Sequence, residues 1–221
     1  MLLVITACDP SSDFSEQSTT GYHRWADTEL ESLADLSIPA LRNRTYGSQL
    51  SLLARLGSAT ETSEYSAYFS RDGSKPYDTY VAGYLSDGLE VTARIDVPPT
   101  APPDTGFPVV VFVHGWYGRE GALAYDFMYD AESQYSEAID YYVDRGFLVV
   151  SPSLRGHGSV NGVPADGIEF LEAWDNGSYI SPIFYAIDVL NLVDSLDGSD
   201  LPLDDNSFHN REVLSQLINP E

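Results

Sequence analysis

The sequence is poor in cysteine and in positive charge, and each shortage excludes a class of protein. A single cysteine, Cys8, among 221 residues cannot form an internal disulfide, so the fold must depend on its hydrophobic core. Eleven basic residues against 34 acidic ones give a formal net charge of −23, which repels phosphate backbones and anionic lipids. We therefore expect no nucleic-acid partner, and we interpret the acidity as a source of solubility.

Long apolar runs and cofactor motifs are missing as well. No segment approaches the ~18 consecutive apolar residues of a membrane-spanning helix. The glycines form neither G-x-G-x-x-G nor a P-loop, and the histidines and carboxylates do not have metal-ligand spacing. We expect no cofactor and no metal. With 43% apolar residues, the chain has enough material for a folded domain with a real core.

The one cysteine follows a short apolar run. Residues 2–7 precede Cys8, and the polar residues 9–20 follow it. This arrangement resembles the end of a bacterial lipoprotein signal, in which a small residue precedes the lipidated cysteine and a polar tether follows. The basic start and the ~7–15 apolar residues of a complete signal are missing, so a clipped start and a chance match are both open. We predict lipidation at Cys8, a secreted or cell-envelope location in a bacterium, and membrane contact only through this anchor.

The first half of the chain has the patterns of a short helix and of antiparallel strands. Residues 28–41 predict a helix with Thr28 as its N-cap and a break at Pro39. Asp87-Gly88 predicts a hairpin turn, after which alternate residues of segment 89–97 place an apolar face toward the core. Alternation also predicts strands over three earlier segments: residues 48–56, 64–71 and 78–86.

The second half alternates between buried strands and helices. Residues 109–113 and 147–150 are apolar throughout, as in strands of a parallel sheet that are buried on both faces. Residues 132–145 have an apolar stripe at helical spacing. A further helix is predicted after Ser181, with Ile183, Ile187, Leu190 and Val193 on one face. This order predicts a doubly wound α/β sheet with antiparallel lead-in strands.

Four segments, in order, resemble those of prolyl oligopeptidase-like α/β-hydrolases, which are serine hydrolases. Tyr84–Val91 is similar to the opening hairpin of these enzymes, and Phe112–Gly115 is similar to their oxyanion turn. Arg155-Gly156-His157-Gly158 is similar to the loop after the next strand, and Ala186–Leu190 to the helix before the nucleophile. The resemblance covers residues 41–221 and implies a hydrolase that cleaves ester or peptide bonds through an acyl-enzyme. We then assign residues 1–8 to a partial signal and residues 9–40 to a polar tether and short helix.

The resemblance also implies roles for the residues that follow strand 109–113. His114, Gly115 and Tyr117 would form the oxyanion turn, and the Trp116 backbone N–H would face the developing oxyanion. The same turn also looks like that of acetyl xylan esterases, which keeps carbohydrate deacetylation open. The implied partner is a small-molecule or peptide substrate, and the oligomeric state is left open.

The nucleophile of the family is missing. No G-x-S-x-G occurs, and Asn219-Pro220-Glu221 looks like the turn that precedes the nucleophile strand. Ser159 is a poor substitute, because Val160-Asn161-Gly162 after it does not begin a helix. We expect the N-terminal portion of a hydrolase, inactive by itself because the nucleophile, acid and catalytic His are all absent. The alternative is a non-catalytic acidic lipoprotein that serves as a binding module. It requires a self-sufficient sheet, whereas we expect strand 109–113 to have an unpaired edge.

Overall fold

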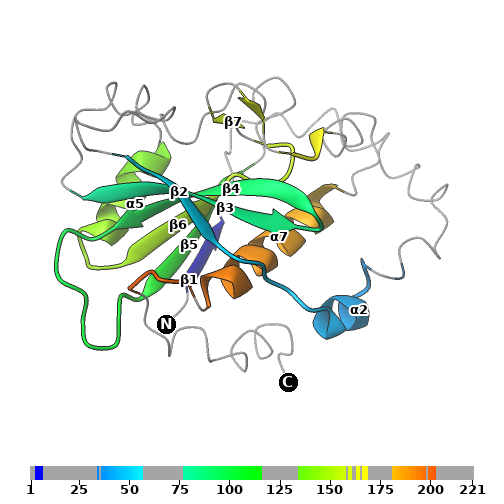
Figure 1. The fold of residues 1–221 in the computed structure, drawn as a ribbon, viewed down its shortest axis with the longest axis horizontal. Coiled ribbons are helices and arrows are strands. Elements are labelled where there is room, and N and C mark those ends of the chain that lie inside the picture. The colour runs from blue at the N-terminus through cyan, green and yellow to red at the C-terminus, as the bar shows by residue number, and fades with distance from the viewer. Residues whose placement is uncertain are drawn as a thin grey trace.

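A computed structural model describes residues 3–6, 34, 36–56, 77–115, 134–157, 159–160, 163–164, 166–168, 181–197 and 199–202. Its main feature is a six-stranded mixed sheet accompanied by helices (Figure 1). The strands of this sheet are β1 (Leu3–Thr6), β2 (Ser51–Leu56), β3 (Asp78–Ser86), β4 (Leu89–Val97), β5 (Val109–Val113) and β6 (Leu148–Pro152). The helices are α2 (Ile38–Asn43), α5 (Gln134–Val143) and α7 (Ser181–Leu196). A separate two-stranded ribbon is formed by β7 (Ser159–Val160) and β8 (Val163–Pro164).

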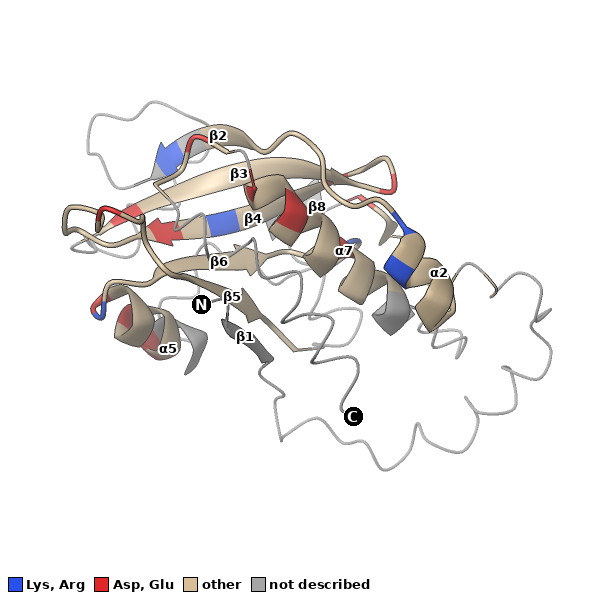
Figure 2. Cartoon of the chain, turned by 90° about the horizontal axis from the view of Figure 1, so that it is seen from below, with Lys and Arg blue, Asp and Glu red and all other residues tan. Residues whose placement is uncertain are grey.

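The strand order is β1-β5-β6-β4-β3-β2, which Figure 2 shows edge to edge. β5 is parallel to both β1 and β6, whereas β6–β4, β4–β3 and β3–β2 are antiparallel. The fold is therefore of the α/β type, with the antiparallel lead-in strands that the sequence predicts. None of the helices in the described ranges is long and apolar enough to cross a membrane.

The β3–β4 hairpin forms where its sequence predicts it. Asp87 and Gly88 both have positive φ, 54° and 82°, as a two-residue type I′ turn requires. The register pairs Ser86 with Leu89 across this turn. Because side chains alternate along a strand, β4 then directs its residues Val91, Ala93 and Ile95 into the core, where they are fully buried.

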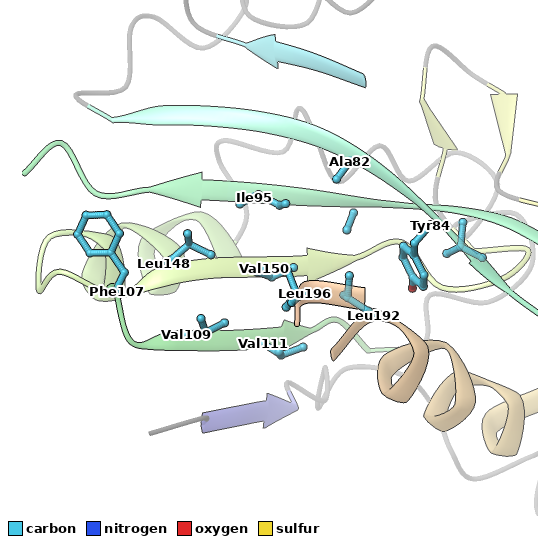
Figure 3. Packing of buried hydrophobic residues seen from close by; sticks show 12 residues of the cluster. Ala82, Tyr84, Ile95, Phe107, Val109, Val111, Leu148, Val150, Leu192 and Leu196 are labelled. Carbon is cyan, nitrogen blue, oxygen red and sulfur yellow. The ribbon is translucent and has the colours of Figure 1, made fainter. Parts of the chain in front are cut away.

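β5 and β6 are buried on both faces, as their uninterrupted apolar sequences predict. Val109 and Val111 pack with Leu192 and Leu196 of α7, in the cluster of Figure 3. On the other face, Val110, Phe112 and Val149 pack against Ile139 and Val143 of α5. Helices thus cover both faces of the central parallel strands.

Two expectations are corrected. β5 does not have an unpaired edge, because β1 pairs with it over Leu3–Thr6, inside the run predicted as part of a lipoprotein signal. The physical reason is that a buried strand needs partners for its N–H and C=O groups, and this apolar segment provides them. The N-terminal helix is α2, capped by Ser37, and Pro39 lies in its first turn, where proline is tolerated, instead of ending it. Thr28 and residues 64–71 lie outside the described residues.

Candidate functional site

The candidate site lies at the C-terminal ends of β5 and β6. Parallel neighbours end at the same edge of a sheet, and in α/β proteins this edge is where ligands bind. β5 is followed by His114-Gly115, and β6 by the loop of residues 153–157. The loop is tightly folded, since Leu154 and Gly156 both have a φ of 61°.

His114 connects the two strand ends. Its Nδ1 lies 2.9 Å from the carbonyl oxygen of Gly115, and its Nε2 lies 3.2 Å from that of Ser153. The side chain is buried, and burial lowers its pKa, although the two backbone oxygens act in the opposite direction. The imidazole therefore lies between the turn after β5 and the loop after β6, and its neutral form donates to one of the two carbonyl oxygens.

His157 stacks on His114. The ring centroids are 4.4 Å apart with an interplanar angle of 17°, and Tyr185 of α7 approaches His157 edge-on at 6.2 Å. Burial lowers the pKa of His157 far below its usual range, and the neighbouring His114 lowers it further. Two neutral imidazoles can stack closely, whereas two imidazolium ions would repel each other.

Arg155 fixes the loop to α7. Its guanidinium donates from Nε and Nη2 to Asp188 Oδ1 at 2.9 and 2.6 Å, and its backbone N–H donates to Asp188 Oδ2 at 2.8 Å. Nη2 also donates to Ser86 Oγ at 3.1 Å and to Asp87 Oδ2 at 2.9 Å, in the β3–β4 turn. Arg155 and Asp188 are 1% and 0% exposed. We call Arg155, Asp188, Ser86, Asp87 and Asn191 the Arg155 network.

The polar face of α7 that contributes to this network was not predicted from the sequence. The apolar positions of α7 predict a core-facing stripe that includes Leu190 and Val193, but these two are only partly buried. The buried face also carries Asp188, Asn191 and Ser195. A polar residue at every third or fourth position beside Ile187 and Leu192 is the signal that could have revealed this face.

Asn191 and Ser195 extend the contacts of α7 to the segment before β2. Asn191 Nδ2 donates to Ser86 Oγ at 2.9 Å, and its Oδ1 accepts from the Gly47 N–H at 3.1 Å. Ser195 Oγ accepts from the Ser48 N–H at 2.8 Å. α7 therefore ties together the loop of the site, the β3–β4 turn and the lead-in segment.

The predicted site residues have different outcomes. His114 and Gly115 lie at the end of β5 as expected, whereas Trp116, Tyr117 and Cys8 lie outside the described residues. Ser159 lies in β7, where it pairs with Pro164, and so belongs to a strand ribbon. In the part of the chain that the structure describes, no group of three or more His, Cys, Asp or Glu side chains could hold a metal ion.

Comparison with known protein families also indicates a hydrolase. The profile of the X-Pro dipeptidyl-peptidase (S15) family matches residues 87–179, a span that contains β5, α5, β6 and the loops after both strands. The match supports a peptidase of the serine-hydrolase type. The S15 family has an α/β-hydrolase fold, with which the observed mixed sheet is compatible. No curated protein and no solved structure matches the chain.

Proposed function

We propose that this chain provides the oxyanion-hole side of a serine peptidase, and that the nucleophile comes from a segment that this sequence does not contain. The observation that carries the proposal is the position of the His114-Gly115 turn. It lies at the end of a buried parallel strand, beside the loop of the next strand, inside the span that matches the S15 family. The family name makes peptides with an N-terminal X-Pro dipeptide the first substrate class to test.

In this proposal the Trp116 backbone N–H donates a hydrogen bond to the oxygen that becomes negative when a serine attacks the scissile carbonyl. Such a donor contributes most when it is already oriented, and loss of one donor costs about 10²–10³-fold in kcat. His114 would act as a positioning residue, because its ring lies between the Gly115 and Ser153 carbonyl oxygens and its one N–H donates to one of them. The acyl-enzyme and its hydrolysis depend on the nucleophile segment.

The first test is an assay of the chain itself on Gly-Pro-p-nitroanilide and p-nitrophenyl acetate. We expect no turnover above the uncatalysed rate, because no G-x-S-x-G serine is present. Turnover that disappears in Ser159→Ala would overturn the assignment of the nucleophile to another segment.

The second test uses a polypeptide that extends this sequence through a G-x-S-x-G segment, if the reading frame after Glu221 encodes one. It should hydrolyse the Gly-Pro amide, with the ester as the alternative substrate. Trp116→Pro removes the N–H and should lower kcat by about 10²–10³-fold, while the matched control Trp116→Phe keeps the N–H. Equal kcat values for the two variants would exclude the Trp116 N–H as the oxyanion donor.

For location, we propose that Cys8 carries a lipid anchor on a cell-envelope protein. The support is the small residue before Cys8 and the polar run after it. Expressed in a bacterium behind a complete signal, the protein should carry fatty acid and partition into detergent. A Cys8→Ser protein that stays equally membrane-bound would show that Cys8 is not the anchor.

A further inference from the structure

The segment that leads from α2 into the sheet lies along α7 and the end of β3. We call residues 44–48 the strap. The N–H groups of Gly47 and Ser48 donate to polar side chains of α7 at 3.1 and 2.8 Å, and Ser48 Oγ accepts from the Leu85 N–H at 2.9 Å. Gly47 has a φ of 93°, and a Cβ on it would lie 2.7 Å from Asp194 Oδ2. The strap therefore lies close against the helix that also holds the loop of the candidate site.

A single carboxylate connects the strap to this loop. Asp87, in the β3–β4 turn, forms an ion pair through Oδ1 with Arg44, the first residue of the strap. Its Oδ2 accepts from Arg155 Nη2 at 2.9 Å. Arg155 in turn pairs with Asp188 of α7, so two arginines and two aspartates alternate in sign along one chain of contacts. This chain begins at a side chain that is 33% exposed and ends at one that is fully buried.

We propose that Arg44 is a positioning residue for the candidate site. It acts through Asp87 and Arg155 on the loop of residues 153–157. The Arg44 guanidinium holds the Asp87 carboxylate where its second oxygen reaches Arg155, and Arg155 sets where the loop lies beside the turn after β5. That this loop belongs to a hydrolase site rests on the proposed function, whereas the coupling between the strap and the loop does not.

Asp87 depends on Arg44 because of where the carboxylate lies. Its side chain is 23% exposed, so water competes with Arg155 for its oxygens. A carboxylate that pairs with two guanidinium groups has both oxygens occupied and fewer rotamers open to it. Without Arg44, the remaining three charges sum to −1, and repulsion from Asp188 favours rotation of Asp87 toward solvent. The strap thus supplies the charge that keeps Asp87 on the loop.

The loop end of this chain reaches the residue that precedes the predicted oxyanion turn. The Ser153 carbonyl oxygen lies 3.2 Å from His114 Nε2, and the His157 ring stacks on the His114 ring at a centroid distance of 4.4 Å. Arg155 lies between these two loop residues and also donates its backbone N–H to Asp188 at 2.8 Å. A shift of Arg155 therefore changes both contacts of His114.

A double-mutant cycle in the full chain tests the coupling. Arg44→Met removes the charge, and Asp87→Asn keeps the hairpin because Asn-Gly favours the type I′ turn. The amides of residues 155–157 should exchange ~2–5-fold faster in Arg44→Met, as loss of a partly exposed ion pair predicts, and at least as fast in Asp87→Asn. In the Asp87→Asn background, Arg44→Met should change these rates by less than ~1.5-fold, because its path to the loop is already broken.

A matched control and a rescue separate positioning from a general loss of stability. Arg55 and Asp78 form an ion pair at 2.7 Å at the opposite end of β3 from the turn, so Arg55→Met removes an arginine of the same kind and should leave the loop amides unchanged. Arg44→Lys restores a charge for Asp87 and should return the loop amides to within ~2-fold of the unaltered chain.

Nuclear magnetic resonance gives a signature at the site itself. The imidazole signals of His114 and His157 should shift in Arg44→Met and stay in place in Arg55→Met, because only the first change displaces the stacked rings.

Three results would overturn the assignment: loop amides and imidazole signals that do not respond to Arg44→Met, an equal response to Arg55→Met, or effects of Arg44→Met and Asp87→Asn that add in full. None of these readouts measures hydrolysis. If the loop responds as expected but the hydrolase assays fail, the coupling stands and the proposed function falls.

Discussion

The α7 layer and the α5 layer of the molecule both bury an arginine–aspartate pair, but the two pairs connect different things. Arg155 and Asp188 lie 33 positions apart and join the loop after β6 to α7. Arg94 and Asp96 lie two positions apart on β4, on the face that packs toward α5. The first pair fixes the position of one element relative to another, whereas the second joins two residues of the same strand.

The partners of the two aspartates reinforce this difference. Asp188 accepts hydrogen bonds from Ser86 Oγ and from the backbone and side chain of Arg155. Asp96 accepts from Thr79, its cross-strand neighbour on β3, at 2.6 Å. A buried ion pair contributes little net stability on average, but removal of one partner is costly. Buried charge near the candidate site therefore holds a loop against a helix, while on the opposite face Arg94, Asp96 and Thr79 bring buried polar groups of the β3–β4 hairpin together.

The largest expected effect comes from Asp188→Ala. It leaves the Arg155 guanidinium, 1% exposed, without its main counter-charge, so the free energy of unfolding should fall by about 3–5 kcal/mol in urea titrations. The control Arg155→Met/Asp188→Leu removes both charges and should lose much less. A loss below about 1 kcal/mol for Asp188→Ala would mean that Asp87 alone can balance Arg155, and would break the distinction between the layers.

A pair of glycine substitutions compares the site loop with the α5 side. Gly156 and Gly146 both have positive φ, 61° and 81°, but a Cβ on Gly156 would lie 2.5 Å from the Gly167 carbonyl oxygen, whereas one on Gly146 would meet nothing within 4 Å. Gly146→Ala should cost about 1 kcal/mol from backbone strain alone, and Gly156→Ala about 2–3 kcal/mol. Thermal unfolding measures the loss of stability in both variants. Equal losses would show that the loop of residues 153–157 can shift to accommodate the added Cβ.

Asparagine substitutions sharpen the contrast between the two aspartates. Asp188→Asn places an amide against donors that both carboxylate oxygens now accept, so we expect a loss of about 2 kcal/mol. Burial raises the pKa of Asp96, with Arg94 and Thr79 acting in the opposite direction. Asp96→Asn removes this disfavoured charge but leaves Arg94 Nε facing an amide, so we expect a loss smaller than that of Asp188→Asn. The two losses come from parallel urea titrations. A larger loss for Asp96→Asn than for Asp188→Asn would show that the Arg94–Asp96 pair contributes more to stability than the Arg155–Asp188 pair.

The pH dependence of stability should have opposite signs in the two layers. Below pH 6.5 the unfolded histidines bind protons while buried His114 and His157 stay neutral, so stability should fall as the pH falls toward their lowered pKa values. Asp96 acts in the other direction, since its raised pKa lets the folded state gain a proton first as the pH falls toward 3.8.

The change His157→Phe tests the assignment of this pH dependence to the stacked histidines. Phenylalanine keeps an aromatic ring against His114 but does not titrate, so the loss of stability between pH 7 and pH 5 should be smaller than in the unaltered chain. Chemical unfolding at a series of pH values measures the slope. An unchanged slope would place the acid sensitivity elsewhere in the molecule.

Much of the framework could be predicted because its signals are local. β3 and β4 have the predicted bounds, and β5 and β6 follow from apolar runs of the length of a strand. His114 and Gly115 follow β5, while Trp116 lies outside the described residues, so their role as an oxyanion turn stays a prediction. The polar stripe of α7 could not be predicted with equal certainty. Asp188 and Asn191 look like surface residues until the partners that surround them are known.

The sequence by itself determined the hairpin, the buried strands and the absence of a G-x-S-x-G serine, because period-two alternation, an Asp-Gly turn and a motif are properties of neighbouring residues. Only the tertiary structure decided that Asp188 receives Arg155 and that Leu3–Thr6 pairs with β5. Both contacts join segments far apart in the chain. A carboxylate accepts from whichever donor the packing brings to it, and a strand pairs with whichever edge is within reach.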